Sequence, residues 1–226
     1  MRKFTPAFVW AGGGLFVAAL AICGDTYVRR WARPHPFDAA AIVVDALLFS
    51  IFALHHSLFA RDGVKQSLAR WVTEPLLRST YVWTASALLI TVCAAWRPVG
   101  GEVFRHAGLL AVAHDMAQVA GVLIIAQAVR RIDALELAGI HPHAASEPLQ
   151  ISGPYRWVRH PIYSGWLLLT FGAAHMTGDR LAFAVISTSY LLIAMPLEER
   201  ALRASFGIRY AEYQQLVRYR LVPYVY

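Results

Sequence analysis

Charged residues and cysteines are scarce in this sequence. Only 15% of its 226 residues are charged, whereas 58% are hydrophobic and the mean hydropathy is +0.46. This composition excludes an ordinary soluble globular protein and is typical of a membrane protein with several spans. The two cysteines, Cys23 and Cys93, both lie inside apolar segments. Neither a disulfide framework nor a thiolate metal site is therefore supported, and we expect no metal.

The excess of positive charge also has a membrane explanation. A formal net charge of +7 and an isoelectric point near 9.7 would suit a nucleic-acid-binding protein. The basic residues, however, stand at the ends of apolar segments and do not form one stripe. Arginines in such places anchor helices to anionic lipid headgroups. We therefore expect membrane lipids, and no nucleic acid, among the partners of a single membrane domain over residues 1–226.

Six apolar segments are candidates for membrane helices, because a helix needs about 20 mostly apolar residues to cross a bilayer. The first resembles a signal peptide, but Gly24-Asp25-Thr26 offers no persuasive cleavage site, so we expect a retained helix. The fifth is short and reaches the sixth through a tight turn at residues 177–180, which predicts a helical hairpin that need not span fully. The six segments are residues 6–23, 39–58, 79–96, 107–129, 162–176 and 181–197.

The predicted fold is thus all-α, a polytopic transmembrane helical bundle of five to six segments with a four-helix N-terminal part over residues 1–130. The sixth helix is expected to continue to a stop at Gly207, in the αL conformation. Residues 209–218 predict an amphipathic surface helix with Tyr210, Tyr213 and Val217 on one face. Lysines and arginines are most frequent on the side of the amino terminus. This places both termini and the suspected site in the cytoplasm, and the spans in a bacterial inner membrane.

Polar residues gather in residues 153–199, at the rims of two apolar helices. The stretch begins G-P-Y-R-W-V-R-H-P-I-Y-S-G-W and ends at the adjacent carboxylates Glu198 and Glu199. Pro161 suits the first turn of a helix, which puts His160 at the N-cap. Free N–H groups and the helix dipole favour an anionic group there, such as a cofactor carboxylate. The alternative is an interfacial belt of arginines and aromatic residues without a ligand.

The two glutamates are expected to have different roles. Both lie at the end of a helix where the dipole disfavours negative charge, so each needs a compensating partner. Adjacent helix residues point about 100° apart. We assign Glu198 to the cofactor and Glu199 to an arginine, while local pairing with Arg200 and Arg203 is the alternative that needs no ligand.

Together these residues resemble the signature of the isoprenylcysteine carboxyl methyltransferase and phospholipid methyltransferase superfamily. The resemblance extends through L-E-E-R-A-L-R-A-S-F-G-I-R-Y-A-E-Y and covers residues 147–217. It implies an integral membrane enzyme that holds S-adenosyl-L-methionine in this part, enclosed by the last hairpin and the C-terminal helices. The cofactor contacts that it implies are Gln150, Tyr155, His160, Pro161, Ile162, Tyr163 and Glu198.

Other residues bear on the methyl acceptor. Prenylcysteine carboxyl methyltransferases place an arginine one turn before the glutamate, where this chain has Ala194, which disfavours a carboxylate acceptor. Residues 56–61, Lys65 and residues 78–82 are similar to membrane methanethiol S-methyltransferases. That similarity implies a small or lipophilic acceptor, best a thiol such as methanethiol, which gives dimethyl sulfide. Prenylcysteine carboxyl groups and phospholipid amines remain the alternatives.

Methyl transfer from a sulfonium mainly needs positioning and the exclusion of water. A thiol with a pKa of about 8.5 is only slightly ionised at neutral pH, so a base or a cation would help. His56, His160 and Arg61 are the catalytic candidates.

A rival hypothesis is a non-enzymatic redox or haem accessory protein linked to nitrogen-oxide metabolism. Its histidines would be His55, His56, His106 and His114. The expected topology, however, puts the first two and the last two at opposite membrane faces.

Overall fold

The computed structural model describes residues 5–59, 64, 67, 70, 74–132, 134–141 and 148–226. The chain forms two compact units, Met1–Gly100 with Ala134–Ala145, and Gly101–Asp133 with Ser146–Tyr226. Among the described residues, five helices are long and apolar enough to cross a membrane. They are Pro6–Arg30, Ala39–Phe59, Leu76–Ala95, Gly108–Val129 and Gly178–Phe206. The predicted polytopic helical membrane protein is thereby confirmed.

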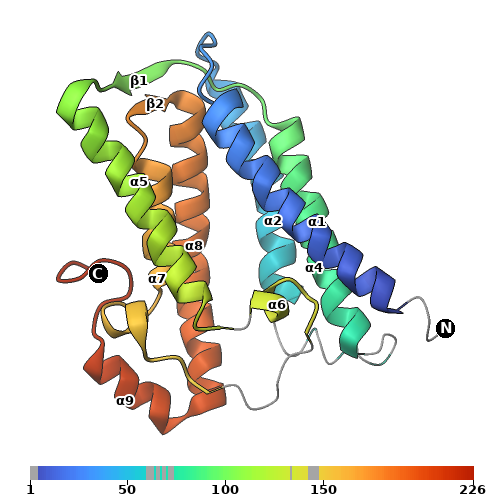
Figure 1. The fold of residues 1–226 in the computed structure, drawn as a ribbon. Helices are drawn as coiled ribbons and strands as arrows, with labels where there is room; N and C mark the ends of the chain where they lie inside the picture. Colours follow the sequence, from blue (N-terminus) through green and yellow to red (C-terminus); the bar gives the residue numbers. More distant parts are fainter. Residues whose placement is uncertain are drawn as a thin grey trace. The chain divides into compact units, whose positions relative to one another are not determined.

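The first unit is built from helices that pack along their lengths (Figure 1). Helix α1 packs against α4, and α2 also contacts α4. The buried carboxylate of Asp45, in the middle of α2, accepts a hydrogen bond of 2.9 Å from the backbone N–H of Arg97. One oxygen of this buried carboxylate is therefore paired with the backbone just after α4. The elements are α1 (Thr5–Asp25), the π-helix η1 (Thr26–Arg30), α2 (Ala39–Phe59), α4 (Glu74–Ala95) and α6 (Ala134–Leu137).

The second unit contains the stretch that the sequence singled out (Figure 1). Helix α7 packs between α5 and α8, because it contacts both. The short strands β1 and β2 pair antiparallel, with Arg105 opposite His175. The elements are β1 (Glu102–Arg105), α5 (Gly108–Val129), the 3-10 helix η2 (Gly153–Arg156), α7 (Pro161–Phe171), β2 (His175–Thr177), α8 (Gly178–Phe206) and α9 (Ile208–Leu216).

The predicted hairpin differs from the structure at its turn. Helix α7 has 11 residues, about 16 Å of axis, so the helix alone is shorter than a hydrocarbon core of about 30 Å. The segment from η2 to β2 nevertheless returns along α5, because η2 lies near the C-terminal end of α5 and β2 pairs with β1, which precedes α5. The expected tight turn at residues 177–180 is wrong. Thr177 ends β2 and caps α8, because its side chain accepts a hydrogen bond from the N–H of Arg180. The segment between α7 and α8 is a strand because it pairs with β1, which lies about 70 residues earlier in the chain.

Two glycines allow α5 and α7 to touch. A Cβ atom added to Gly121 would lie 2.6 Å from the carbonyl oxygen of Gly165, and one added to Gly165 would lie 2.6 Å from that of Gly121. Distances this short leave no room for a side chain, so the two backbones can approach only as glycines. Gln118 adds a hydrogen bond of 2.8 Å to the carbonyl of Leu169. The contact positions the amino end of α7, where the suspected site begins.

Replacing Gly165 by alanine should therefore destabilise the protein by about 1–3 kcal/mol, the usual cost of overpacking. Thermal unfolding in detergent micelles measures the change. Gly14→Ala in α1 is the matched control, because nothing lies within 4 Å of an added Cβ there. That variant should gain about 0.5–1 kcal/mol from helix propensity. A Gly165→Ala protein as stable as Gly14→Ala would contradict the close contact.

The C-terminal end of α8 follows the prediction with one correction. The helix ends at Phe206, and Gly207 has φ 56° and ψ −126°. The stop at Gly207 is confirmed, but the αL conformation is wrong, because this ψ belongs to the mirror image of the extended region, which glycine alone adopts readily. Tyr210, Tyr213 and Val217 form the buried face of α9, as expected. Leu149, Leu202 and Phe206 pack against that face.

Candidate active site

The site is built around the loop between η2 and α7. His160 is the N-cap of α7 and Pro161 is its first residue, as predicted. The C-terminal segment holds this loop through the backbone. The N–H of Arg159 donates to the carbonyl of Tyr219 at 3.0 Å, and the N–H of His160 donates to that of Arg220 at 2.9 Å. The end of the chain therefore contributes directly to the position of His160.

Glu199 lies in a buried ionic network, with a side chain that is 7% exposed. Its Oε1 is 2.6 Å from Nε of Arg159, and its Oε2 is 3.1 Å from Nη2 of Arg220. Arg159 also donates to the carbonyls of Val217 and Arg218, at 2.8 and 2.7 Å. Nε and Nη1 of this guanidinium thus have acceptors, which offsets part of the cost of burying the pair.

The pairing of Glu199 with arginine is confirmed, but its partners were not anticipated. They are Arg159 and Arg220 instead of the local residues Arg200 and Arg203. Arg159 lies 40 residues from Glu199 along the chain. Tertiary packing, and not helix spacing, selects these partners.

Glu198 is held differently, since its side chain is 50% exposed. The hydroxyl of Tyr163 donates to Oε1 of Glu198 at 2.7 Å, and Nδ1 of His160 lies 3.5 Å from Oε2. The rings of His160 and Tyr163 stack, with centroids 5.4 Å apart and planes 8° apart. One carboxylate is thus oriented by two protein groups while part of it remains open to a ligand. Such a group can accept hydrogen bonds from an ammonium or from hydroxyls.

His160 lies between the two glutamates. Its Nε2 is 3.4 Å from Oε1 of Glu199, while its Nδ1 faces Glu198. A neutral imidazole carries one N–H and one acceptor nitrogen, whereas the protonated ring donates from both. Whichever ring nitrogen of His160 carries the proton, its N–H therefore faces a carboxylate.

Tyr155 of η2 is electrostatically coupled to the same group. Burial raises the pKa of Tyr155 to about 12, and the negative charge of Glu198 adds to the shift. The phenol is therefore protonated at physiological pH and acts as a hydrogen-bond donor. Its own backbone carbonyl accepts a 2.7 Å hydrogen bond from the hydroxyl of Tyr213, which ties η2 to α9.

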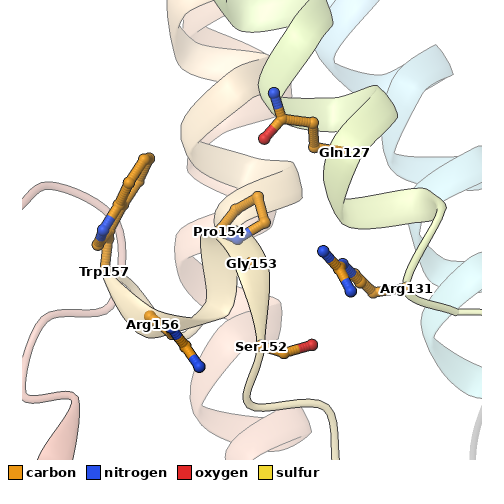
Figure 2. Close-up of a pocket in the computed structure, with 7 residues that line it drawn as sticks. All are labelled: Gln127, Arg131, Ser152, Gly153, Pro154, Arg156 and Trp157. Atoms are coloured by element: carbon orange, nitrogen blue, oxygen red, sulfur yellow. The ribbon is translucent and has the colours of Figure 1, made fainter.

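A cavity of about 450 Å³ adjoins η2 (Figure 2). Its two cationic side chains come from different elements: Arg131 follows the end of α5, and Arg156 belongs to η2. No residue of the group around Glu198 lines it. The lining residues are Gln127, Arg131, Ser152, Gly153, Pro154, Arg156 and Trp157.

Comparisons with known proteins assign this arrangement to a family. The family model described as the isoprenylcysteine carboxyl methyltransferase (ICMT) family matches residues 119–204. Methanethiol S-methyltransferase 2 of Bradyrhizobium diazoefficiens is 35% identical, over 97% of this chain and 85% of that protein. Methanethiol S-methyltransferase of Mycobacterium tuberculosis is 33% identical, over 89% of this chain and 87% of that protein. The chain belongs to this family of membrane methyltransferases. No solved structure matches it.

Membership of the methyltransferase family confirms the predicted class of enzyme. It also agrees with the helices, because an integral membrane protein with five apolar helices is expected of a membrane methyltransferase. Nurim of Danio rerio is a more distant relative, 28% identical over 80% of this chain.

The structure brings most of the predicted cofactor residues into one region of the second unit. His160, Tyr163 and Glu198 are in contact, and Tyr155 is coupled to Glu198 through charge. Pro161 and Ile162 begin α7 beside them. Within the described residues, Gln150 lies in the irregular segment before η2 and does not join these hydrogen bonds.

The other two catalytic candidates belong to the first unit or are not described. His56 lies in the last turn of α2, where the hydroxyl of Tyr81 is 2.8 Å from its Nδ1. Arg61 lies outside the described residues. The histidines of the rival haem hypothesis fall in both units. The rings of His106 and His114 are 4.8 Å apart in the second unit, whereas His55 stacks on Tyr81 in the first.

Arg159 lies inside the motif without a predicted role, and Arg220 is a site residue that no sequence pattern singled out. Arg220 lies beyond the matched motif, in a segment without periodicity, and it contacts Glu199 from 21 residues away. Only its position in a short basic run, residues 218–220, could have drawn attention to it.

Proposed function

We propose that this protein transfers a methyl group from S-adenosyl-L-methionine to a small thiol, and that methanethiol is the preferred acceptor, with dimethyl sulfide as the product. The observation that carries the proposal is the half-exposed carboxylate of Glu198, oriented by Tyr163 and His160. The names of the relatives, methanethiol S-methyltransferases, support the choice of acceptor.

The residues around Glu198 suit the proposed donor. Glu198 would accept hydrogen bonds from its ammonium or ribose hydroxyls, and Tyr155 would donate one from a protonated phenol. Pro161, Ile162 and Tyr163 would supply apolar and aromatic surface beside them, and Gln150 is proposed to complete the set. When bound, S-adenosyl-L-methionine supplies an activated methyl group on a sulfonium.

The protein's contribution to the reaction would be mainly positional. In the transfer, the thiol sulfur forms the new carbon–sulfur bond, the old one breaks, and the thiol proton must leave. His160 is the group beside Glu198 that can take up this proton, because its two nitrogens face carboxylates. His56 and Arg61 remain proposals for assisting thiol ionisation.

The proposed thiol acceptor is also supported by the lack of a cationic side chain one turn before Glu198. Ala194, one turn before Glu198, is 9% exposed and cannot neutralise a carboxylate substrate. A neutral or thiol acceptor therefore fits α8 better than the carboxyl group of a prenylcysteine. We place the site and both termini on the cytoplasmic side of a bacterial inner membrane, because that side would carry most of the lysines and arginines.

Cells that express this chain and receive methanethiol should release dimethyl sulfide into the headspace, where gas chromatography measures it. The same cells expressing Glu198→Ala should release no more than cells without the protein. If the wild type binds S-adenosylhomocysteine but releases no dimethyl sulfide above that level, the thiol is the wrong acceptor. Lipid amines and prenylcysteine peptides would then be tested with the same purified enzyme.

A further inference from the structure

Two cavities of different character meet at η2. The first is the cavity of about 450 Å³ that Arg131 and Arg156 line. The second, about 770 Å³, is lined almost entirely by apolar side chains of α5, α7 and the C-terminal segment. Pro154 and Trp157 line both cavities. A cationic cavity and an apolar one are therefore adjacent within the second unit.

Among the described residues, no carboxylate lines the cationic compartment. Neither Arg131 nor Arg156 forms an ion pair with a carboxylate in the described part of the chain. Gly153 has φ +62°, and an added Cβ atom would lie 3.1 Å from Nε of Arg131, so that the guanidinium rests against the η2 loop. Gln127 and Ser152 add neutral hydrogen-bond donors to the lining (Figure 2). Guanidinium groups with such neighbours provide the hydrogen-bond donors and positive charge that bind a phosphate.

The apolar compartment follows a membrane helix. Its lining on α5 extends from Leu110 to Ile124, about 21 Å of helix axis. One leaflet of a bilayer with a core of about 30 Å is about 15 Å deep, so the groove can take an acyl chain. Trp157, which is 66% exposed, stands where the two compartments meet. Tryptophan side chains are enriched at the level of lipid headgroups.

We propose that the two cavities form one binding site for an anionic phospholipid. Its phosphate lies between Arg131 and Arg156, and one acyl chain lies in the groove between α5 and α7. The positive charge of the two arginines favours an anionic headgroup, and the apolar lining of the groove favours an acyl chain. The bound lipid ties the end of α5 to η2, the segment that carries Tyr155. The cationic part of this site shares no residue with the group around Glu198, whereas the apolar groove includes Pro161. The proposal does not depend on the identity of the methyl acceptor.

Delipidated full-length protein tests the proposal by its binding of phosphatidylglycerol from detergent, measured by native mass spectrometry. The double variant Arg131→Gln/Arg156→Gln should bind this lipid roughly 25-fold less tightly, because each arginine near a membrane contributes about fivefold. Ala117→Trp, which fills the groove, should weaken binding as well. Arg209→Gln, an exposed arginine of α9 outside both cavities, should bind like the wild type.

Two further probes separate the sources of the anion. Phosphatidylcholine should bind more weakly than phosphatidylglycerol, and inorganic phosphate should not displace the lipid. Unchanged phosphatidylglycerol binding by the double arginine variant would overturn the proposal. Displacement by inorganic phosphate, or normal binding by Ala117→Trp, would also overturn it, because the site would then hold a free anion or a headgroup alone. Circular dichroism and thermal unfolding in detergent show that each variant is folded.

Discussion

Replacing Glu198 by alanine is expected to abolish measurable binding of S-adenosylhomocysteine, the product of the proposed methyl donor. The carboxylate is half-exposed and already oriented by Tyr163 at 2.7 Å, so a ligand gains its hydrogen bonds without an ordering cost. A hydrogen bond to a charged group contributes about 1.5–3 kcal/mol. Loss of two such bonds corresponds to a Kd about 100-fold or more higher. Isothermal titration of the purified protein in detergent measures it.

The matched control for Glu198→Ala is Glu212→Ala, because Glu212 is an exposed glutamate of α9 outside the site. That variant should bind like the wild type. Tyr163→Phe should lose roughly tenfold, because it removes the hydroxyl that orients Glu198 and keeps the ring that stacks on His160. Tight binding by the Glu198→Ala protein would show that the cofactor site lies elsewhere.

Replacing Glu199 by alanine should lower the free energy of unfolding by about 3–5 kcal/mol, the usual effect of removing one partner from a buried ion pair. The reason is that Arg159, whose side chain is 7% exposed, would keep its charge without a counter-ion. Arg220 is 32% exposed, and water would compensate part of its loss. Unfolding of the variant in detergent micelles, followed by circular dichroism, gives the change.

The exposed pair Glu102 and Arg105 supplies the comparison. Its side chains are 51% and 61% exposed at a distance of 3.0 Å, so Glu102→Ala should leave the stability close to that of the wild type. A double-mutant cycle of Glu199→Ala and Arg159→Ala should give a coupling energy of about 1–3 kcal/mol. Equal stability of Glu199→Ala and Glu102→Ala would mean that the buried network does not stabilise the fold.

Much of the membrane architecture was predictable because the bilayer imposes a local rule. Each spanning helix must place about 20 apolar residues in succession, so hydropathy alone located helices α1, α2, α4 and α5 with every boundary within about five residues of the structure. The stop at Gly207 and the N-terminal turn at Pro161 were predictable for a similar reason. Each depends on the backbone conformation that a single residue allows.

The main residues of the candidate site were predictable from the sequence, but the ion-pair partners of Glu199 were not. The ordered motif identified His160, Tyr163 and Glu198, and the angle between adjacent helix positions separated Glu198 from Glu199. Neither observation could select Arg159 and Arg220 over Arg200 and Arg203 as partners of Glu199. The β1–β2 pairing escaped prediction in the same way, because each strand has only three or four residues.

The sequence by itself determined the membrane class, the positions of the helices and the stretch where polar side chains gather, since these follow from local composition and backbone preference. Only the tertiary structure decided which carboxylate is buried and which is open. Glu198 and Glu199 are chemically identical neighbours, and they differ because the C-terminal segment folds back and places Arg220 against one of them. A contact between distant parts of a chain depends on packing and loop closure, which no local pattern encodes.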